Sequence, residues 1–302
     1  MPGELDPKVY RTILEDLPTG VYVVDLDRRI QFWNAWAERI SGHLRHEVIG
    51  RLCSDEPLMR CDAENHVLCG SACPLQQTMQ DGHMREAHVF LRHKEGHRVP
   101  VRVRSIPVRD AEGSIIGAAE NFDESRPWPE PRWRRGGKPA HGVLDPLTGV
   151  LDSPSTEAYL RESFHAFEEA RIPFGVLAIA IDDLDGVWAR RGRQAEEKVL
   201  RMVAATLSKN LSGAEVVGRW RENRFLAIVD KCPAEALARI GAALRSVVGA
   251  AALLWWGDRL SVTISVGGAE AVENDTVESL LARCERALED CIERGGDGMR
   301  IA

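Results

Sequence analysis

The pattern of apolar residues in the second half of the chain predicts strands. Residues 175–181 are apolar throughout, as strands covered on both faces of a sheet tend to be. Two further apolar runs, residues 214–217 and 225–229, flank the charged segment 219–224, and this arrangement predicts an antiparallel hairpin. We expect the charged tip to lie in water, because a buried charge without a partner is unfavourable.

Apolar residues spaced three and four positions apart predict helices in the same half of the chain. A helix over residues 195–207 would face inward through Val199, Leu200, Val203 and Leu207. The last predicted helix, residues 280–293, carries six apolar side chains on one face. These six are Leu280, Leu281, Cys284, Ala287, Leu288 and Cys291.

The first half of the chain alternates short strands with short helices. The predicted helices cover residues 9–17 and 34–41, and the predicted strands cover residues 20–25, 29–33, 85–93, 99–109 and 114–122. A short hairpin, small helices and three antiparallel strands describe an α+β domain with its helices on one face of the sheet.

Length and composition are ordinary for a soluble protein of two domains, with 302 residues of which 44% are apolar and 28% charged. The net charge of −7 gives no support for nucleic-acid binding, since domains that bind nucleic acid usually carry a basic surface. No window is apolar over the roughly 18 residues that a membrane span needs, and the N-terminus lacks a secretory signal pattern. We therefore expect a cytoplasmic protein.

Residues 125–144 separate the two halves. This segment contains four prolines and three glycines, which a continuous helix does not tolerate. It is predicted to link a first domain, residues 1–124, to a second domain, residues 145–302. No heptad pattern crosses it, so a coiled-coil connection is not expected.

Several separate motifs give the second domain a family resemblance. They are Asp145-Pro-Leu-Thr-Gly149, the apolar strand that ends in Asp182-Asp183-Leu184-Asp185, the hairpin, residues 260–267, and Gly295-Gly296 after the last helix. In order and spacing, residues 145–302 closely resemble the GGDEF family, the cyclases that condense two GTP molecules into cyclic di-GMP. The resemblance implies a mixed sheet surrounded by helices.

The signature of that family is changed in this chain. Where the family has Gly-Gly-Asp/Glu-Glu-Phe, this chain has Arg221, Glu222, Asn223, Arg224 and Phe225. In the family, the glycines let the backbone approach the nucleotide, and the acidic pair helps to bind Mg²⁺, a cation that prefers carboxylate and phosphate oxygens. Asn223 and Arg224 cannot replace that acidic pair. No catalytic residue is therefore expected in this segment.

Other positions that the resemblance marks as functional are also changed. The family's metal-binding Asp at the end of the strand corresponds to Ala180, and its guanine-binding Asn corresponds to Trp188. Its phosphate-binding Lys and Arg correspond to Ile292 and Gly296, which cannot neutralise phosphate oxygens. The residues left to bind nucleotide or metal are Asp182, Asp183, Glu197 and Glu222.

The first domain resembles a PAS domain. The motifs that carry the resemblance are Leu17-Pro-x-Gly20, Val24-Asp25, Ile30-x-Phe-Trp33-Asn34 and Glu47-Val-Ile-Gly50. PAS domains usually sense a small ligand, a cofactor or a redox state, or they dimerise. The resemblance places Trp33 and Asn34 at the PAS pocket. A haem or flavin in that pocket remains open.

Four of the seven cysteines, Cys53, Cys61, Cys69 and Cys73, lie close together in the first domain. Thiolates are ligands for zinc and for iron–sulfur clusters. Their spacing is not the paired Cys-x2-Cys of a structural zinc site, so an iron–sulfur cluster, zinc, a reversible disulfide and inert buried thiols all stay open. The nearby His83, His88, His93 and His97 are interpreted as ordinary strand and turn residues.

Two functions follow from these observations. In the first, a bacterial-type signalling protein, the PAS domain senses a ligand, metal or redox state. The GGDEF-like domain then contacts a protein partner in cyclic di-GMP signalling through residues 219–224. Whether the chain also forms a homodimer stays open. In the second, the chain is an active cyclase that binds GTP and Mg²⁺ through Asp182, Asp183, Asp185 and Glu222.

Overall fold

The computed structural model describes residues 6–55, 60–62, 67–69, 73–124, 143–211 and 215–302. Their contacts divide the chain into two compact units, Met1–Ser125 and Arg126–Ala302. The predicted linker falls almost wholly on residues 125–142, which lie outside the described residues.

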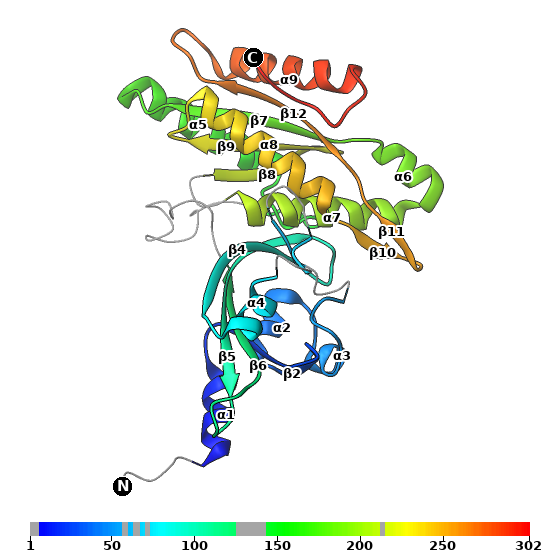
Figure 1. Ribbon diagram of the computed structural model, residues 1–302. Helices are drawn as coiled ribbons and strands as arrows, with labels where there is room; N and C mark the ends of the chain where they lie inside the picture. Colours follow the sequence, from blue (N-terminus) through cyan, green and yellow to red (C-terminus); the bar gives the residue numbers. More distant parts are fainter. Residues whose placement is uncertain (1–5, 56–59, 63–66, 70–72, 125–142, 212–214) are drawn as a thin grey trace. The chain divides into compact units, whose positions relative to one another are not determined.

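The first unit is built on one antiparallel sheet with the strand order β2-β1-β6-β5-β4-β3 (Figure 1). Helices α2, α3 and α4 share a single core with this sheet, and the rings of Tyr22, Trp33 and Phe122 pack together at its centre. The strands are β1 (Gly20–Asp25), β2 (Ile30–Trp33), β3 (Arg60–Cys61), β4 (Arg85–Arg92), β5 (Arg98–Arg109) and β6 (Ile115–Glu124). The helices are α1 (Pro7–Asp16), α2 (Ala35–Ser41), α3 (Arg45–Val48) and α4 (Pro74–Asp81).

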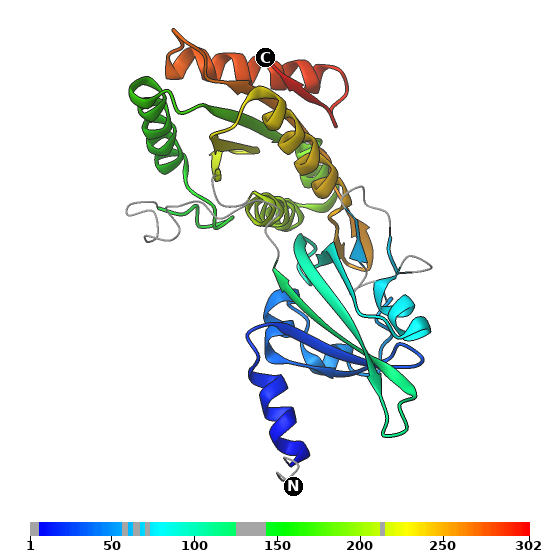
Figure 2. The same ribbon diagram turned by 60° about the vertical axis from the view of Figure 1, so that its left-hand side comes forward.

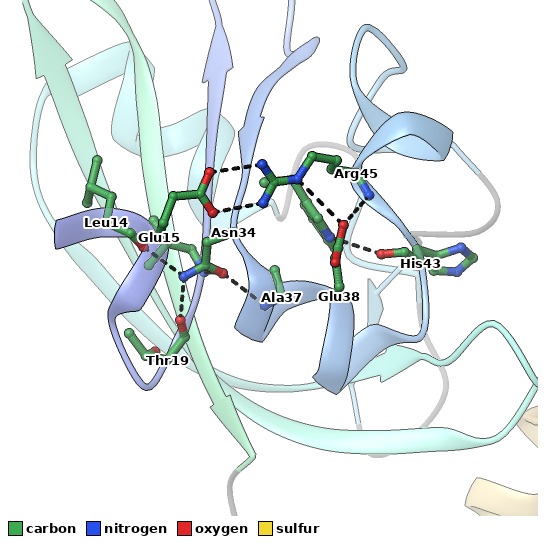
Figure 3. A network of polar contacts seen from close by, with 10 residues as sticks. Leu14, Glu15, Thr19, Asn34, Ala37, Glu38, His43 and Arg45 are labelled. Carbon is green, nitrogen blue, oxygen red and sulfur yellow. Dashed lines mark hydrogen bonds and ion pairs between the residues drawn. The ribbon is translucent and has the colours of Figure 1, made fainter. Parts of the chain in front are cut away.

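One buried amide holds α1 against the sheet (Figure 3). Asn34 is fully buried at the N-terminus of α2. Its Oδ1 accepts hydrogen bonds from the amides of Val21 and Ala37, each at 2.9 Å, and its Nδ2 donates to the carbonyls of Leu14 (3.0 Å) and Thr19 (2.9 Å). These four bonds use the whole hydrogen-bonding capacity of the side chain.

A surface ion pair supports the same junction. Both guanidinium nitrogens of Arg45 donate to the carboxylate of Glu15 on α1, at 3.0 and 2.8 Å (Figure 3). The amide of Arg45 donates to Glu38 at 2.7 Å and so joins α2 to α3. Because bidentate Arg–carboxylate pairs are geometrically specific, this contact sets the direction in which α1 leaves the domain.

The second unit is a mixed sheet with the strand order β13-β12-β7-β9-β8. Only the β12–β13 pair is parallel. The strands of this sheet are β7 (Phe174–Ile181), β8 (Glu215–Arg221), β9 (Arg224–Asp230), β12 (Ile264–Glu270) and β13 (Met299–Ile301), and a separate hairpin comprises β10 (Leu253–Trp255) and β11 (Asp258–Leu260). The helices are α5 (Ser153–Ala170), α6 (Leu184–Arg191), α7 (Arg193–Asn210), α8 (Ala234–Ala250) and α9 (Val277–Glu293).

The central strand β7 is buried on both faces, and this is why its sequence is apolar throughout. Alternate residues from Phe174 to Ala180 pack into a core with α5 and α9, whereas Leu177, Ile179 and Ile181 pack into a second core with α6, α7 and α8. The two views show α9 and α7 on opposite sides of the sheet (Figure 1; Figure 2).

The structure corrects one of the sequence-based expectations. The turn of the hairpin consists only of Glu222 and Asn223, because β8 runs to Arg221 and β9 begins at Arg224. Residues 260–267 comprise the end of β11, an irregular connection and the start of β12. The charged segment alone could not locate the hairpin turn, because its arginines belong to the two strands.

We predict that Asn34→Ala lowers the free energy of unfolding of the first unit by about 3 kcal/mol, because two amides and two carbonyls would lose their partner. The measurement is native-state hydrogen exchange of the unit's amides in the full chain. Gln31→Ala, at an exposed position nearby, is the matched control and should change stability by less than about 0.5 kcal/mol. Equal effects of the two variants would contradict the role of Asn34.

Candidate functional site

The strand register brings together two positions at which the family resemblance expects acidic residues. Ala180 on β7 lies directly opposite Arg224 on β9. Opposed residues on paired strands project from the same face, here the face covered by α9. Ala180 is 3% exposed, and the guanidinium of Arg224 pairs with Glu289 on α9 at 2.6 Å. The pair of carboxylates expected in the family is therefore replaced by a methyl group and a cation.

The other cations of the hairpin also have acidic partners. Arg221 pairs with Glu285 on α9 at 3.2 Å. Arg219 donates to the carbonyl of Glu222 at 2.9 Å and lies 3.4 Å from the carboxylate of Asp145. Arg221 is exposed, as expected of the tip, whereas Arg219 and Arg224 are partly buried beside their partners.

The motif Asp145-Pro-Leu-Thr-Gly149 forms a tight turn that supports the hairpin. Asp145 Oδ1 accepts from the amide of Thr148 (2.8 Å) and from its hydroxyl (2.6 Å), and Gly149 adopts a φ of 71°, which favours glycine. Burial raises the pKa of Asp145, but the Thr148 bonds and the nearby Arg219 outweigh burial, so that the pKa lies below its usual value. Asp145 is thus held as a carboxylate under Arg219.

Asp182 has a structural set of partners. Its Oδ2 accepts from the hydroxyl of Thr263 (2.7 Å) and the amide of Asp297 (2.9 Å), and its Oδ1 accepts from the hydroxyl of Ser265 (2.8 Å). These contacts fasten the loop after α9 to the end of β7. Gly296 is required in this loop, since a Cβ there would lie 3.0 Å from the Asp182 carboxylate and its φ is 78°.

The remaining candidate acids face solvent and pair with arginines. Asp183 contacts Arg190 at 2.7 Å, and Glu197 lies between Arg193 (3.2 Å) and Arg201 (3.5 Å). Such exposed pairs contribute little to stability. Trp188, at the position of the guanine-binding residue, is 57% exposed on α6. Within the described residues, no three of the candidate acids place carboxylate oxygens within 4.8 Å of one another.

At the phosphate-binding positions the structure shows Ile292 at the surface, 37% exposed, and Gly296 in the loop beside Asp182. A cavity of about 460 Å³ lies next to this loop and is lined in part by Arg294 and Arg300. Arg300 pairs with Asp290 at 2.9 Å, so that one of the two arginines that line the cavity has its charge neutralised.

Sequence reasoning missed a buried ion pair inside the first unit. The guanidinium of Arg60 on β3 pairs with Glu120, which is fully buried on β6. Glu120 also accepts from the hydroxyls of Tyr22 (3.1 Å) and Ser105 (2.7 Å). Burial acts to lower the pKa of Arg60, but the Glu120 carboxylate outweighs it and holds the pKa above its usual value. The one signal in the sequence was an arginine inside the cysteine-rich segment.

Two of the four cysteines, Cys53 and Cys69, lie close to this ion pair, and within the described residues no three of the four sulfurs lie within 4.8 Å of one another. The sulfur of Cys69 accepts from the amide of Arg60 at 3.5 Å, Cys53 and Cys73 pack into the core, and Cys61 is buried on β3. Within the part of the chain that the structure describes, three ligand atoms lie within 4.8 Å of one another only at His93, Glu95 and His97. His66 lies outside the described residues.

Trp33 and Asn34 are both committed to the fold. Trp33 is 2% exposed, and its Nε1 donates to the carbonyl of His43 at 3.1 Å. Asn34 spends its four hydrogen bonds on the backbone, as described above. A buried polar cluster in this unit consists of the Arg60–Glu120 ion pair and the hydroxyls of Tyr22 and Ser105. Contact of Trp33 or Asn34 with a ligand stays a prediction.

Comparison with known proteins identifies the two units. The PAS fold family matches residues 8–120, and the diguanylate cyclase GGDEF domain family matches residues 142–297. The chain thus has a PAS domain followed by a GGDEF domain, as the motifs predicted. It belongs to the GGDEF family.

Two curated relatives carry cyclase names. Diguanylate cyclase DgcP of Pseudomonas aeruginosa is 27% identical over 163 residues, which are 53% of this chain and 24% of DgcP. Probable diguanylate cyclase DgcE of Escherichia coli is 23% identical over 261 residues, which are 84% of this chain and 22% of DgcE. The chain therefore spans about a quarter of the length of these relatives.

Solved structures share the fold of the second unit. Diguanylate cyclase SiaD of Pseudomonas aeruginosa, in complex with its activator SiaC, aligns with a TM-score of 0.52 and 24% identity over 53% of this chain and 62% of that chain. The GGDEF domain of FimX from Pseudomonas aeruginosa aligns with a TM-score of 0.51 and 18% identity over 53% of this chain and 99% of that chain. Within the described residues, no helix is both long and apolar enough to cross a membrane.

We predict that Cys53 is nearly inert toward alkylation in the native protein. Burial is the main cause that raises the pKa of Cys53 to about 12. At about pH 8 its thiolate fraction should be roughly 1,000-fold smaller than that of an ordinary cysteine, and the labelling rate should rise with pH, because the thiolate is the nucleophile. Mass spectrometry after timed iodoacetamide labelling measures this rate. The control is the same chain in concentrated urea, and equal rates in both conditions would contradict the prediction.

Proposed function

We propose that this chain is a signalling protein whose GGDEF domain binds a partner and does not make cyclic di-GMP. The observation that carries the proposal is the direct opposition of Ala180 and Arg224 on β7 and β9. In a working cyclase these positions would carry acidic groups for Mg²⁺, as the family resemblance implies. Here the guanidinium of Arg224 extends to Glu289 on the same face.

A cation at this place opposes metal binding. At an effective dielectric constant of 20, a unit positive charge about 4 Å from Mg²⁺ is unfavourable by about 8 kcal/mol. Phosphoryl transfer depends almost wholly on positioning and on charge neutralisation by metal ions and cationic side chains. The loss of the acidic pair therefore removes the main source of catalysis.

Three further features support the absence of cyclase chemistry. The three hydrogen bonds to Asp182 join β7 to the loop after α9, so that this carboxylate already serves the fold. Ile292 and Gly296 offer no charge to a triphosphate at the positions where the family has Lys and Arg. Asp183 and Glu197 are paired with arginines on the surface.

For the PAS domain we propose a sensory role at the buried ion pair of Arg60 and Glu120. A buried ion pair contributes little net stability to a fold, because both charged groups lose their hydration. Cys53 and Cys69 lie close to the pair, so that a ligand, a metal bound by the thiolates or oxidation of a thiol would each change its surroundings. If an iron–sulfur cluster or zinc is bound by Cys53, Cys61, Cys69 and Cys73, the positive charge of the metal must offset the unfavourable burial of the thiolates.

A protein partner in cyclic di-GMP signalling is the proposed output. The solved relative SiaD is in complex with a protein activator, so that protein contacts are compatible with this fold. On this chain the charged surface comprises Arg221, which is 61% exposed at its side chain, together with Glu285 of α9, which it contacts.

We expect the purified chain to form no cyclic di-GMP from GTP with Mg²⁺ or Mn²⁺ above the level of a protein-free blank. Product chromatography measures this, with an active diguanylate cyclase as the positive control. Product that disappears in Asp183→Asn or Glu222→Gln would overturn the proposal in favour of an atypical cyclase. Asp182 is not suitable for this test, since its loss would disturb the loop after α9.

A metal titration tests directly whether the Arg224 cation prevents metal binding, and its result does not depend on whether the preparation is catalytically active. Thermal unfolding of the wild-type chain should not respond to Mn²⁺ or Mg²⁺ in this domain, whereas the double variant Ala180→Asp/Arg224→Glu should be stabilised by either ion, because two opposed carboxylates then need a cation. Arg224→Glu alone is the matched control. A wild-type response as large as that of the double variant would contradict the charge argument.

We further expect the chain to change the activity of a cyclase or phosphodiesterase of its source organism in trans. Arg221→Glu should weaken this effect, because it reverses the exposed charge and breaks the contact with Glu285. The double variant Arg221→Glu/Glu285→Arg keeps the ion pair but reverses its direction. It therefore separates the effect of breaking the ion pair from the effect of changing the charge that a partner would contact. An effect in trans that is unchanged in Arg221→Glu would show that the hairpin is not the contact surface.

A further inference from the structure

The turn between β4 and β5 gathers two imidazoles and a carboxylate. It comprises His93, Lys94, Glu95, Gly96 and His97. One nitrogen from each histidine and one carboxylate oxygen of Glu95 all lie within 4.8 Å of one another. We propose that these three side chains bind a first-row divalent cation of the zinc type. The site is separate from the cysteines and independent of the proposed output function.

The hairpin register explains why the two imidazoles meet. The amide of His93 donates to the carbonyl of His97 at 2.9 Å, so the two residues close the hairpin as a cross-strand pair. Paired residues project from the same face, and the two rings stack with their centroids 4.2 Å apart. The neighbouring pair, Arg92 and Arg98, projects from the opposite face of the sheet, because successive side chains alternate.

The turn residues add the third ligand. The amide of Gly96 donates to the carbonyl of His93 at 2.8 Å, and Gly96 adopts a φ of 92°, so the chain reverses tightly between the two histidines. Glu95 folds back toward His93: its amide donates to Nδ1 of that ring at 3.1 Å, and its Oε2 lies 3.9 Å from the same nitrogen. Because Nδ1 accepts this bond, it carries no proton, and an ion bound at Nδ1 would take the place of the Glu95 amide at its lone pair.

The surroundings hold the turn in place. The amide of Lys94 donates to the carbonyl of Ser41 at 2.8 Å, and its ammonium group pairs with Glu47. The ring of His93 lies against Gly42 at the end of α2, where a Cβ would come within 2.6 Å of Nε2. His97 is 5% exposed. The scaffold thus holds the two imidazoles side by side. The rings must turn out of their stack for both to direct a nitrogen at one ion, and the exposed Glu95 can adjust to it.

The donor set suits zinc and its neighbours. Two imidazoles and one carboxylate form the protein side of many tetrahedral zinc sites, with water as a fourth ligand. Bonds of about 2.0–2.1 Å in such a site place ligand atoms about 3.4 Å apart. The 3.9 Å from Nδ1 to Oε2 must therefore shorten by about half an ångström, and a rotation of the exposed Glu95 side chain can supply this movement.

The test is titration of the full chain, first freed of metal, with Zn²⁺ by calorimetry and with Co²⁺ by visible absorption. Binding should give cobalt bands of nitrogen and oxygen ligation without a sulfur-to-cobalt charge-transfer band. Loss of a ligand in His93→Ala or Glu95→Gln should weaken binding by at least the roughly 10- to 100-fold that loss of a second-shell partner causes. His83→Ala, at an exposed histidine outside the site, is the matched control.

Each outcome decides the proposal. Glu95 is highly exposed, so Glu95→Gln should fold normally and remains informative if a histidine variant does not. Unchanged affinity in Glu95→Gln and His93→Ala would overturn the proposal. So would a dominant sulfur-to-cobalt band lost in Cys69→Ser, because the ion would then be bound by the cysteines. No binding of Zn²⁺ at micromolar concentration would also overturn it.

Discussion

The structure of the GGDEF domain depends on the burial of β7 on both faces. Helices cover the strand on either side, and β9 and β12 flank it at its edges. An isolated carboxylate at such a place is unfavourable unless a cation offsets it. In a metal-binding cyclase the ion performs that task. In this chain Ala180 places no carboxylate on that strand, and Arg224 pairs with Glu289 on α9.

The same principle governs the PAS domain, with the opposite solution. There the sheet retains a buried charge pair, Arg60 and Glu120, and satisfies it with the hydroxyls of Tyr22 and Ser105. Cys53 and Cys69 lie close to Arg60. Because these groups are desolvated together, a change in any one of them alters the electrostatic balance of the others.

Much of the fold could be predicted from short-range pattern, because the burial of a strand or helix is written in the spacing of its own apolar residues. The strands that were predicted, and the last helix, lie within a few residues of those in the structure. The short strands β3, β10, β11 and β13 and the helices α5 and α8 were not predicted, because local apolar content does not reveal which segments pack together. The PAS and GGDEF assignments came from motifs and were confirmed.

The sequence by itself determined which residues occupy the positions expected for metal, base and phosphate, since identity at a motif position does not depend on folding. Only the tertiary structure decided what those residues do instead. Arg224 meets Glu289, Asp182 meets Asp297, Arg60 meets Glu120, and His93 meets His97. The first three contacts join residues at least 60 positions apart in the chain, and the fourth depends on the exact register of a turn. Strand pairing and helix packing set these distances, and no local pattern encodes them.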